Sequence, residues 1–296
     1  PDIAQLENFK SQSAQWADIK VPGEWSMQGF EVKPGTAAAY TRDFTVPADW
    51  SGKNIFLRCD AVYSDAVVYL NGKKVGKHSG GFTPFDLDLS SSVQPGTNQL
   101  VITALNESVA DKLASGSRYA CHQLGGIPRG IRLYALPPSH LTGLRVITKF
   151  DSAWENATLE LETSMAGGPA ELLVSLKRTQ SDQSAPSVLT DHKVPIGSAS
   201  IPVSRPAKWD PEHPNLYLLT IKVVAGGKTV QTITQRIGFR QIEVRGNQLF
   251  VNNQPVKLRG SNHHEVYPTT GRSVPAGIHR RDIELFREGN ANLLRT

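Results

Sequence analysis

The sequence predicts a mainly β protein in which two antiparallel β-sandwiches precede the start of a parallel β/α fold. Three observations support this prediction. Short runs of alternating apolar and polar residues, separated by turns, fill most of the chain from Ala39 to Ile237. The pair Pro137-Pro138 divides these runs into two groups. Beyond Gly238 the order changes to hairpin, polar loop, helix and strand.

The first group of predicted strands ends at Leu136. Its strongest local signal is Asn71-Gly72, because a two-residue hairpin turn needs positive φ at both central positions. Short strands with regular turns are typical of an antiparallel sandwich. The predicted strands are residues 39–46, 54–59, 65–70, 74–76, 82–89, 99–105 and 130–136.

The second group covers about one hundred residues, up to Ile237. Seven or so strands over this length match an immunoglobulin-like sandwich, although the Cys-Trp-Cys set of antibody domains is absent. The strands that the pattern predicts directly are residues 144–148, 157–163, 170–177, 216–224 and 229–236.

The last segment begins with a hairpin. Residues 249–251 and 256–258 are predicted strands around the turn Asn252-Asn253, and Gly260 is predicted to end the second strand. A helix is predicted over residues 276–288, because Pro275 suits a helix start and Gly289 a helix stop.

The predicted helix has an apolar stripe of Ile283, Leu285 and Phe286, and another strand follows from Asn292 to Arg295. Strand, loop, helix and strand form the unit of parallel sheets and (β/α)8 barrels. In such barrels the loops after the strands build the active site.

These residues resemble a known family. The motif Arg259-Gly-Ser-Asn-His-His-Glu265, followed by Pro268 and later by Gly289, Asn292 and Arg295, is similar to the opening of the catalytic barrel in glycoside hydrolase family 2. That family includes β-galactosidases, β-glucuronidases and β-mannosidases. Four earlier motifs resemble its amino-terminal jelly-roll domain. They are Val21-Pro-Gly-Glu-Trp25, Val68-Tyr-Leu-Asn-Gly72, Gly80-Gly-Phe-Thr-Pro-Phe85 and Gly125-Gly-Ile-Pro-Arg129.

The resemblance covers nearly the whole chain and implies its organisation. Residues 1–138 are expected to form a jelly-roll, sugar-binding-like domain, and residues 139–237 an immunoglobulin-like β-sandwich. Residues 238–296 are expected to form the truncated start of the TIM-barrel catalytic domain. The loop at residues 114–124 and Pro128 depart from the usual family pattern.

The resemblance also implies a function: the chain would be the amino-terminal part of a retaining β-glycosidase, most similar to β-galactosidases, that hydrolyses terminal β-linked sugars. Both catalytic carboxylates of the family come from later barrel strands. We therefore expect no catalytic residue in this chain, and the nucleophile and acid/base beyond Thr296. The chain by itself is expected to be inactive, since removing the carboxylates removes the chemistry.

Three residues are expected to bind substrate or support the site. By resemblance, His264 touches the sugar, Glu265 supports the site without being its acid, and Arg295 orients the nucleophilic carboxylate. A guanidinium can do this through two parallel hydrogen bonds that also hold the carboxylate pKa low. Each residue has a simpler alternative: a loop histidine bonded to backbone, a structural ion pair, and a surface arginine at a strand end.

No metal site is predicted. The side chains of His263 and His264 point to opposite sides of an extended backbone, so they do not hold one metal together. His263 also stands where β-galactosidases often have arginine. Two cysteines, Cys59 and Cys121, do not make a disulfide framework, and we expect two free thiols. We predict no cofactor, and leave open a structural or site cation in a full-length enzyme.

Charge and hydropathy limit the classes of binding partner that the sequence predicts. The net charge is +5, and nine basic and five acidic residues lie from Gly238 onward. Because acids alternate with the basic residues, we expect no nucleic acid partner. The family resemblance implies a carbohydrate substrate. No apolar run reaches the length of a membrane span, so no membrane partner is expected. The sequence does not decide whether the protein forms a homo-oligomer. Pro1 opens the sequence without a visible signal peptide, which leaves periplasmic, secreted and cytoplasmic locations open.

A second functional hypothesis belongs to another class. The two sandwiches could form a carbohydrate-binding or adhesive module without catalysis. The strand–helix–strand unit after Gly238 favours the enzyme, because a pure binding module has no need of it.

Overall fold

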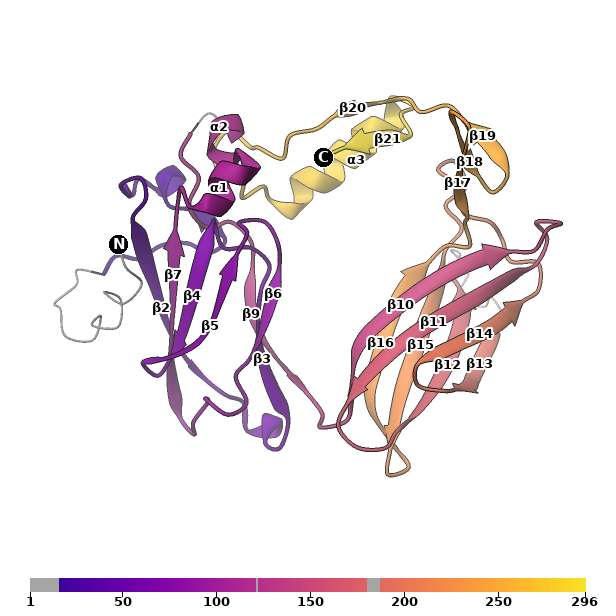
Figure 1. Ribbon diagram of the computed structural model, residues 1–296, viewed down its shortest axis with the longest axis horizontal. Coiled ribbons are helices and arrows are strands. Elements are labelled where there is room, and N and C mark those ends of the chain that lie inside the picture. Colours follow the sequence, from indigo (N-terminus) through magenta and orange to yellow (C-terminus); the bar gives the residue numbers. More distant parts are fainter. Residues whose placement is uncertain (1–15, 121, 180–186) are drawn as a thin grey trace. The chain divides into compact units, whose positions relative to one another are not determined.

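The computed structural model describes residues 16–120, 122–179 and 187–296 and confirms a mainly β fold. The chain separates into two compact units (Figure 1). Unit 1 comprises Pro1–Ala135, Asn262–Gly289 and Leu294–Thr296, and unit 2 comprises Leu136–Ser261 and Asn290–Leu293. The residues at the end of the sequence are therefore divided between the two units.

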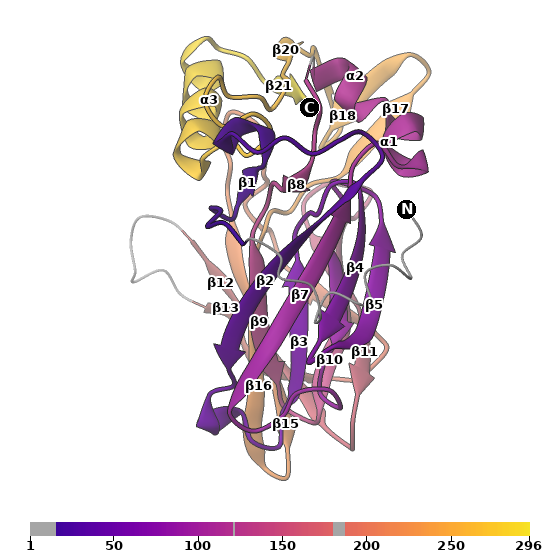
Figure 2. The same cartoon turned by 90° about the vertical axis from the view of Figure 1, so that its left-hand side faces the viewer.

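Unit 1 contains the first sandwich. One sheet has the strand order β2-β7-β4-β5, and these strands lie side by side in Figure 2. The other sheet has the order β6-β3-β9. The strands are β2 (Ala37–Thr45), β3 (Asn54–Cys59), β4 (Asp65–Leu70), β5 (Lys73–Ser79), β6 (Phe85–Asp88), β7 (Thr97–Leu105) and β9 (Ile131–Leu136).

The alternation in the sequence explains the core of the first sandwich. In β3, Ile55, Leu57 and Cys59 are buried while the residues between them are partly exposed. The predicted hairpin is confirmed: Asn71 and Gly72 both have positive φ, 51° and 78°, between β4 and β5. Cys59 is a free thiol, and burial raises its pKa to about 12. Cys121 lies outside the described residues.

Short elements lie around this sandwich. The 3-10 helices η2 (Ser26–Gln28) and η3 (Ala48–Trp50) flank β2 in the sequence. Part of the predicted loop at 114–124 is helical instead, because it contains α2 (Gly116–Ala120), which follows α1 (Val109–Ala114) and precedes β8 (Gly126–Ile127). The Ser108 hydroxyl caps α1 by accepting from the N–H groups of Ala110 and Asp111.

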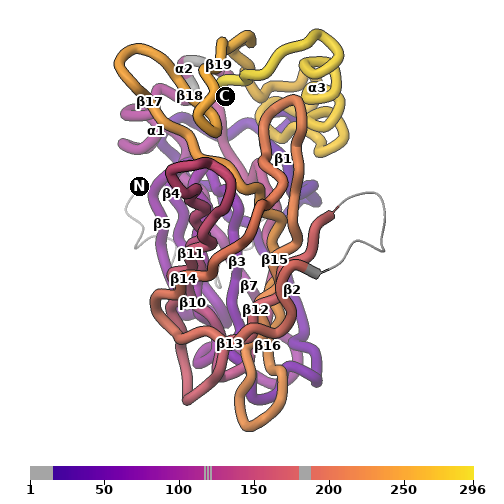
Figure 3. The backbone as a smooth tube through the Cα atoms, turned by 90° about the vertical axis from the view of Figure 1, so that its right-hand side faces the viewer, coloured from indigo at the N-terminus to yellow at the C-terminus, as the bar shows by residue number. Residues whose placement is uncertain are grey.

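Unit 2 contains the second sandwich, with three strands in one sheet and four in the other. The sheets have the orders β10-β11-β14 and β13-β12-β15-β16. Figure 3 draws the backbone of these strands as a tube. The strands are β10 (His140–Phe150), β11 (Ala157–Ala166), β12 (Glu171–Arg178), β13 (Ser187–Val194), β14 (Ser198–Val203), β15 (Tyr217–Ala225) and β16 (Lys228–Ile237). Leu159, Leu176 and Leu219 are among the buried side chains between the sheets.

Two of these strands do not stand out in the sequence. Both β13 and β14 lie at sheet edges. Strand β14 reads Ser-Ala-Ser-Ile-Pro-Val, and Pro202 is tolerated because an edge strand need not donate every hydrogen bond. The sequences of β13 and β14 have weak strand patterns, and both segments form strands at the edges of their sheets.

The segment after the second sandwich begins as a three-stranded meander of β17 (Ile242–Arg245), β18 (Gln248–Val251) and β19 (Gln254–Val256). The turn Asn252-Asn253 is confirmed, with φ values of 49° and 66°. Next come β20 (Gly260–Asn262), α3 (Ala276–Glu288) and β21 (Leu293–Arg295). Helix α3 has the predicted bounds.

The strand before the helix corrects one prediction. Gly260 begins β20 and does not end a strand at 256–258. A Cβ atom at Gly260 would lie 1.9 Å from the carbonyl oxygen of Leu293, so the glycine permits close approach of β20 and β21. The carbonyl of Arg259 accepts from Leu293, and the N–H of His263 donates to Arg295. Partners that advance together along both chains indicate a parallel pair.

Candidate functional site

The candidate site is built around the loop of residues 263–275, which joins β20 to α3 and is called the site loop below. It carries His264 and Glu265, and all of it lies in unit 1. Within it, the N–H of Tyr267 donates to the carbonyl of Gly271 at 2.8 Å, and the N–H of Gly271 donates back at 2.9 Å. These two bonds close the loop into a compact turn.

The first sandwich meets the site loop through a two-stranded ribbon. Strands β1 (Gly23–Glu24) and β8 (Gly126–Ile127) are antiparallel, and Glu24 lies opposite Gly126. A Cβ atom on Gly125 would lie 1.9 Å from the buried ring of Trp25, so only glycine fits beneath the indole. The β1–β8 ribbon thus unites two motifs that lie about a hundred positions apart in the chain.

Glu24 is the buried charge of this ribbon. Its side chain is 1% exposed, and its carboxylate accepts a hydrogen bond from the backbone N–H of Arg272 in the site loop. His122 Nε2 lies 2.8 Å from Glu24 Oε2, and His122 Nδ1 lies 2.9 Å from the carbonyl oxygen of Ala120. His122 thus contacts an oxygen atom through each of its two ring nitrogens.

A second charge joins the ribbon to the start of the site loop. Arg129 Nη2 lies 2.8 Å from Glu265 Oε2, and the hydrogen bond from Arg129 holds the pKa of Glu265 below its usual value. Both side chains are about one-third exposed. Nearby, the hydroxyl of Ser273 donates to the carbonyl oxygen of Pro128 at 3.1 Å. Glu265 is therefore in an ion pair with Arg129.

The two histidines occupy different surroundings. His264 is exposed, and its carbonyl accepts from the N–H of Val266 at 2.8 Å. His263 instead faces α3, where its Nε2 lies 3.1 Å from Asp282 Oδ2 and its ring meets Phe286 edge-on. Within the described ranges, no group of three or more His, Cys, Asp or Glu side chains is placed to hold a metal ion.

Arg295 lies at the end of β21, beside the start of the site loop. Its carbonyl accepts from the N–H of His263 at 2.8 Å, and its Nη1 lies 3.4 Å from Asn262 Oδ1. The side chain is exposed. Arg295 therefore ends β21, and the loop that carries His264 and Glu265 follows the adjacent strand β20.

Sequence reasoning missed the residues that hold the site loop. Glu24, Arg129 and His122 received no role, although two of them stand in motifs that the sequence singled out. One signal was available: a glutamate next to a core tryptophan, in Pro-Gly-Glu-Trp25, is a charge that must be buried and paired. Its partner lies 248 positions away and could not be assigned from the chain.

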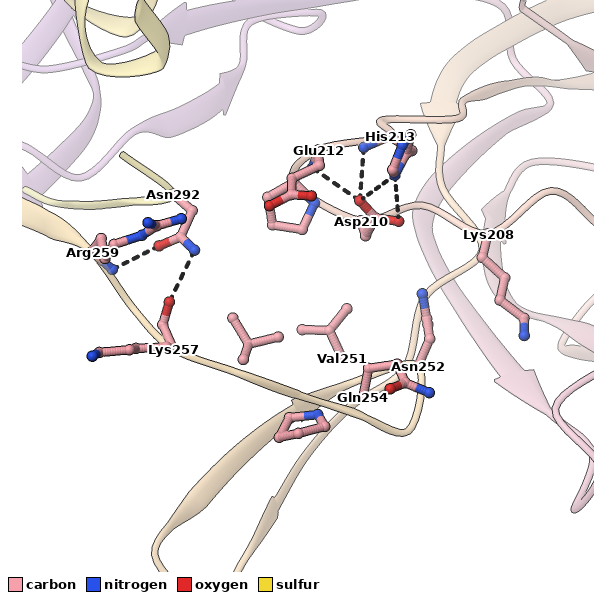
Figure 4. A pocket seen from close by; sticks show the side chains of 13 residues that line it. Lys208, Asp210, Glu212, His213, Val251, Asn252, Gln254, Lys257, Arg259 and Asn292 are labelled. Carbon is pink, nitrogen blue, oxygen red and sulfur yellow. Dashed lines mark hydrogen bonds and ion pairs between the residues drawn. The ribbon is translucent and has the colours of Figure 1, made fainter. Parts of the chain in front are cut away.

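A hollow in unit 2 is separate from these residues. Its volume is about 610 Å³, and Val251, Gln254 and Lys257 are among the residues that line it (Figure 4). Its polar groups maintain local structure: Asp210 accepts from the N–H groups of Glu212 and His213, and Asn292 bridges Arg259 and Lys257. We assign it no ligand.

Two β-sandwiches that precede a strand–helix–strand unit define a modular chain with the start of a TIM barrel at its end. Family models match successive segments of it: the sugar binding domain of glycosyl hydrolases family 2 at residues 5–137, a further family 2 model at 139–240, and the TIM barrel domain at 242–296. The chain belongs to glycosyl hydrolases family 2.

Individual proteins with similar sequences are described as β-glucuronidases and β-galactosidases. The chain is 28% identical to a putative β-glucuronidase of Formosa agariphila over 97% of its own length and 36% of that protein. It is also 28% identical to a β-galactosidase of Thermoanaerobacter pseudethanolicus, over 87% of the chain and 36% of the relative. The chain thus spans about a third of the length of the curated relatives it matches.

Solved structures share the fold. A β-glucuronidase of Ruminococcus gnavus aligns with a TM-score of 0.83 at 23% identity, over all of this chain and 51% of that one. A β-glucuronidase of Bifidobacterium dentium aligns with a TM-score of 0.81 at 21% identity, over 96% of this chain and 53% of that one. Helices that could span a membrane were sought among the described residues, and none qualifies.

Proposed function

We propose that this chain supplies the two sandwiches and the first barrel strands of a retaining β-glycosidase that acts on terminal β-linked sugars. In this proposal residues 1–138 and 139–237 are the two sandwich domains, and residues 238–296 open the catalytic barrel. The finer proposal is a β-galactosidase-like specificity.

One observation carries the proposal. Strands β20 and β21 are parallel, and each has a polar side chain at its carboxyl end. His264 lies just after β20, and Arg295 is the last residue of β21. The carboxyl ends of neighbouring parallel strands lie at one edge, where barrels place their active sites. Exposed His264 can then bond sugar hydroxyls, and exposed Arg295 can receive a carboxylate from elsewhere in the barrel.

The chemistry assigns these residues supporting roles. A retaining glycosidase uses two carboxyl groups about 5 Å apart, one as nucleophile and one as acid/base. By family resemblance both come from barrel strands after β21. Arg295 would orient the nucleophile and favour its ionised form through charge-assisted hydrogen bonds. The 296 residues alone should therefore be inactive.

The first test compares this chain with the protein encoded by the complete gene, on aryl β-galactosides, β-glucuronides and β-mannosides. We expect hydrolysis by the longer protein alone, with β-galactoside preferred. A β-glucuronide preference would overturn the finer proposal only. Hydrolysis by the 296-residue chain at a comparable rate would overturn the assigned roles. Saturable sugar binding without hydrolysis by either protein would favour the carbohydrate-binding module.

A second test concerns His264. In an active full-length protein, His264→Ala should lower kcat/KM by about 10²-fold, since a lost contact to a substrate hydroxyl weakens transition-state binding. The matched control is His213→Ala, which removes another loop histidine whose side chain is 74% exposed. Equal effects of the two substitutions would contradict the sugar-binding role of His264.

A further inference from the structure

We infer that the β1–β8 ribbon of the first sandwich, together with the residues directly after β8, positions the site loop. Glu24 and Arg129 are the two positioning residues. The consequence for catalysis rests on the proposed function, because it assumes that His264 binds sugar. The contacts themselves lie within unit 1 and can be tested without any substrate.

The ribbon holds the site loop at two separate points. Near the loop's start, Arg129 binds the carboxylate of Glu265, and near its end Glu24 accepts from the N–H of Arg272. The hydroxyl of Ser273 adds a bond to the carbonyl oxygen of Pro128, the residue directly after β8. The residues between these points are closed by the paired bonds of Tyr267 and Gly271. Displacing the loop therefore breaks contacts with the ribbon.

The Glu24 attachment is built for one loop conformation. Gly271 has φ +59°, which disfavours other residues, and a Cβ atom there would lie 2.4 Å from Glu24 Oε1. The loop backbone thus passes directly over a carboxylate that is 1% exposed. A buried carboxylate without its partners is costly, so the N–H of Arg272 and the ring of His122 must stay in place.

Arg129 binds the loop at Glu265, next to His264, the residue proposed to bind the sugar. Glu265 follows His264 directly, so the ion pair fixes the backbone that directs the imidazole. A displacement of about 1 Å in a binding group can cost about 10²-fold in rate, because alignment is lost. Arg129 and Glu24 are therefore positioning residues that act through the loop and touch no substrate.

The substrate-free experiment is amide hydrogen exchange of the 296-residue chain. We expect Arg129→Met and Glu24→Gln each to accelerate exchange of the site-loop amides by at least about 10-fold, because local opening becomes easier. The matched control is Arg132→Met. Arg132 belongs to the same sandwich, on β9, and also forms an ion pair, but with Asp60, at 2.5 Å, rather than with a residue of the site loop. Its loss should leave site-loop exchange unchanged.

The kinetic experiment uses the full-length protein. Arg129→Met and Glu265→Gln should each raise KM and lower kcat/KM by about 10-fold or more, with kcat less affected, because loosened His264 binds the sugar less well. The double variant should be no worse than either single variant, as expected for two members of one pair. Arg129→Lys should recover part of the loss, and Arg132→Met should behave as wild type.

The outcomes separate the inference from the proposed function. Unchanged site-loop exchange in Arg129→Met and Glu24→Gln overturns the inference, whatever the enzyme does. Faster exchange with unaltered KM in an active enzyme overturns the role in positioning His264. Faster exchange in the 296-residue chain, combined with a full-length protein that hydrolyses no glycoside, supports the positioning role of the ribbon and rejects the glycosidase. If Arg129→Met does not fold, Glu265→Gln and Arg129→Lys report on the same ion pair.

Discussion

Two glutamates show how single residues connect distant parts of this chain. Glu24 is buried and receives a backbone N–H and an imidazole, whereas Glu265 is partly exposed and receives a guanidinium. Removing a partner from the buried carboxylate leaves an unpaired charge, while the exposed pair is weakened by water. The two contacts should therefore differ in how they respond to mutation.

The Glu265 ion pair should make stability depend on pH in the acid range. Arg129 lowers the folded-state pKa of Glu265 below its ordinary 4.5, so the folded state favours the carboxylate. The resulting stability is fully present above pH 4.5 and is lost as pH falls through the folded-state pKa. Urea unfolding across pH 3 to 7 (roughly the range in which carboxylates titrate) should show wild type and Glu265→Gln converging at the acid end. A pH-independent difference would contradict this.

Gly271 should resist substitution for two reasons that can be separated. Gly271→Ala adds a left-handed residue and a clash with Glu24, and should destabilise unit 1 by about 2–4 kcal/mol. Gly35→Ala is the matched control, since Gly35 has φ +69° and no described atom lies within 4 Å of its added Cβ. It should cost only about 1 kcal/mol, from backbone strain. Equal losses in thermal unfolding would mean that the Glu24 contact adds nothing.

Elements of this chain end and meet where glycine and proline permit. Pro275 and Gly289 bound α3, and Gly260 lets β20 lie against β21. The apolar residues Ile283 and Leu285 of α3 are about half exposed, so amphipathic patterning alone does not explain this helix. Its position follows from its ends and from the contact between Asp282 and His263.

Two glycine substitutions should have opposite effects on this strand–helix–strand unit. Gly260→Ala places a Cβ 1.9 Å from the Leu293 carbonyl and should separate β20 from β21. Exchange of the Leu293 amide, which donates to Arg259, should rise by about 10-fold or more. Gly277→Ala meets no described atom within 4 Å and should stabilise α3 by about 0.5 kcal/mol through helix propensity. Unchanged exchange in Gly260→Ala would argue against the tight strand pair.

At the scale of the whole molecule, each sandwich has its own core. Leu57 is fully buried in the first, and Leu159 and Leu219 are buried in the second. The end of the chain joins both units, since Asn262–Gly289 belongs to unit 1 and Asn290–Leu293 to unit 2. Segments distant in sequence therefore share one compact unit, and stability has to be considered unit by unit.

Core truncations should act on one unit each. Leu57→Ala and Leu219→Ala should each destabilise the unit that contains them by about 2–5 kcal/mol, because a cavity remains where the side chain was. Amide exchange of β4 and of β12 reports the two units separately. Leu57→Ala should accelerate exchange in β4 more than in β12, and Leu219→Ala should do the reverse. Equal acceleration in both strands would show that the cores unfold together.

The sequence by itself determined the mainly β class, most strands, the Asn71-Gly72 hairpin and the bounds of α3. Those features are encoded locally, by period-two alternation and by residues with special backbone preferences. Tertiary structure alone decided the rest. The edge strands β13 and β14 form despite weak patterns, because neighbours supply their hydrogen bonds. Gly260 was predicted to end a strand, but in the structure it allows close approach to Leu293 on β21. The sequence around Gly260 does not reveal this partner, because it lies on another strand. Glu24 and Arg129 meet the site loop only once the chain folds, since no local pattern records a partner more than a hundred residues away.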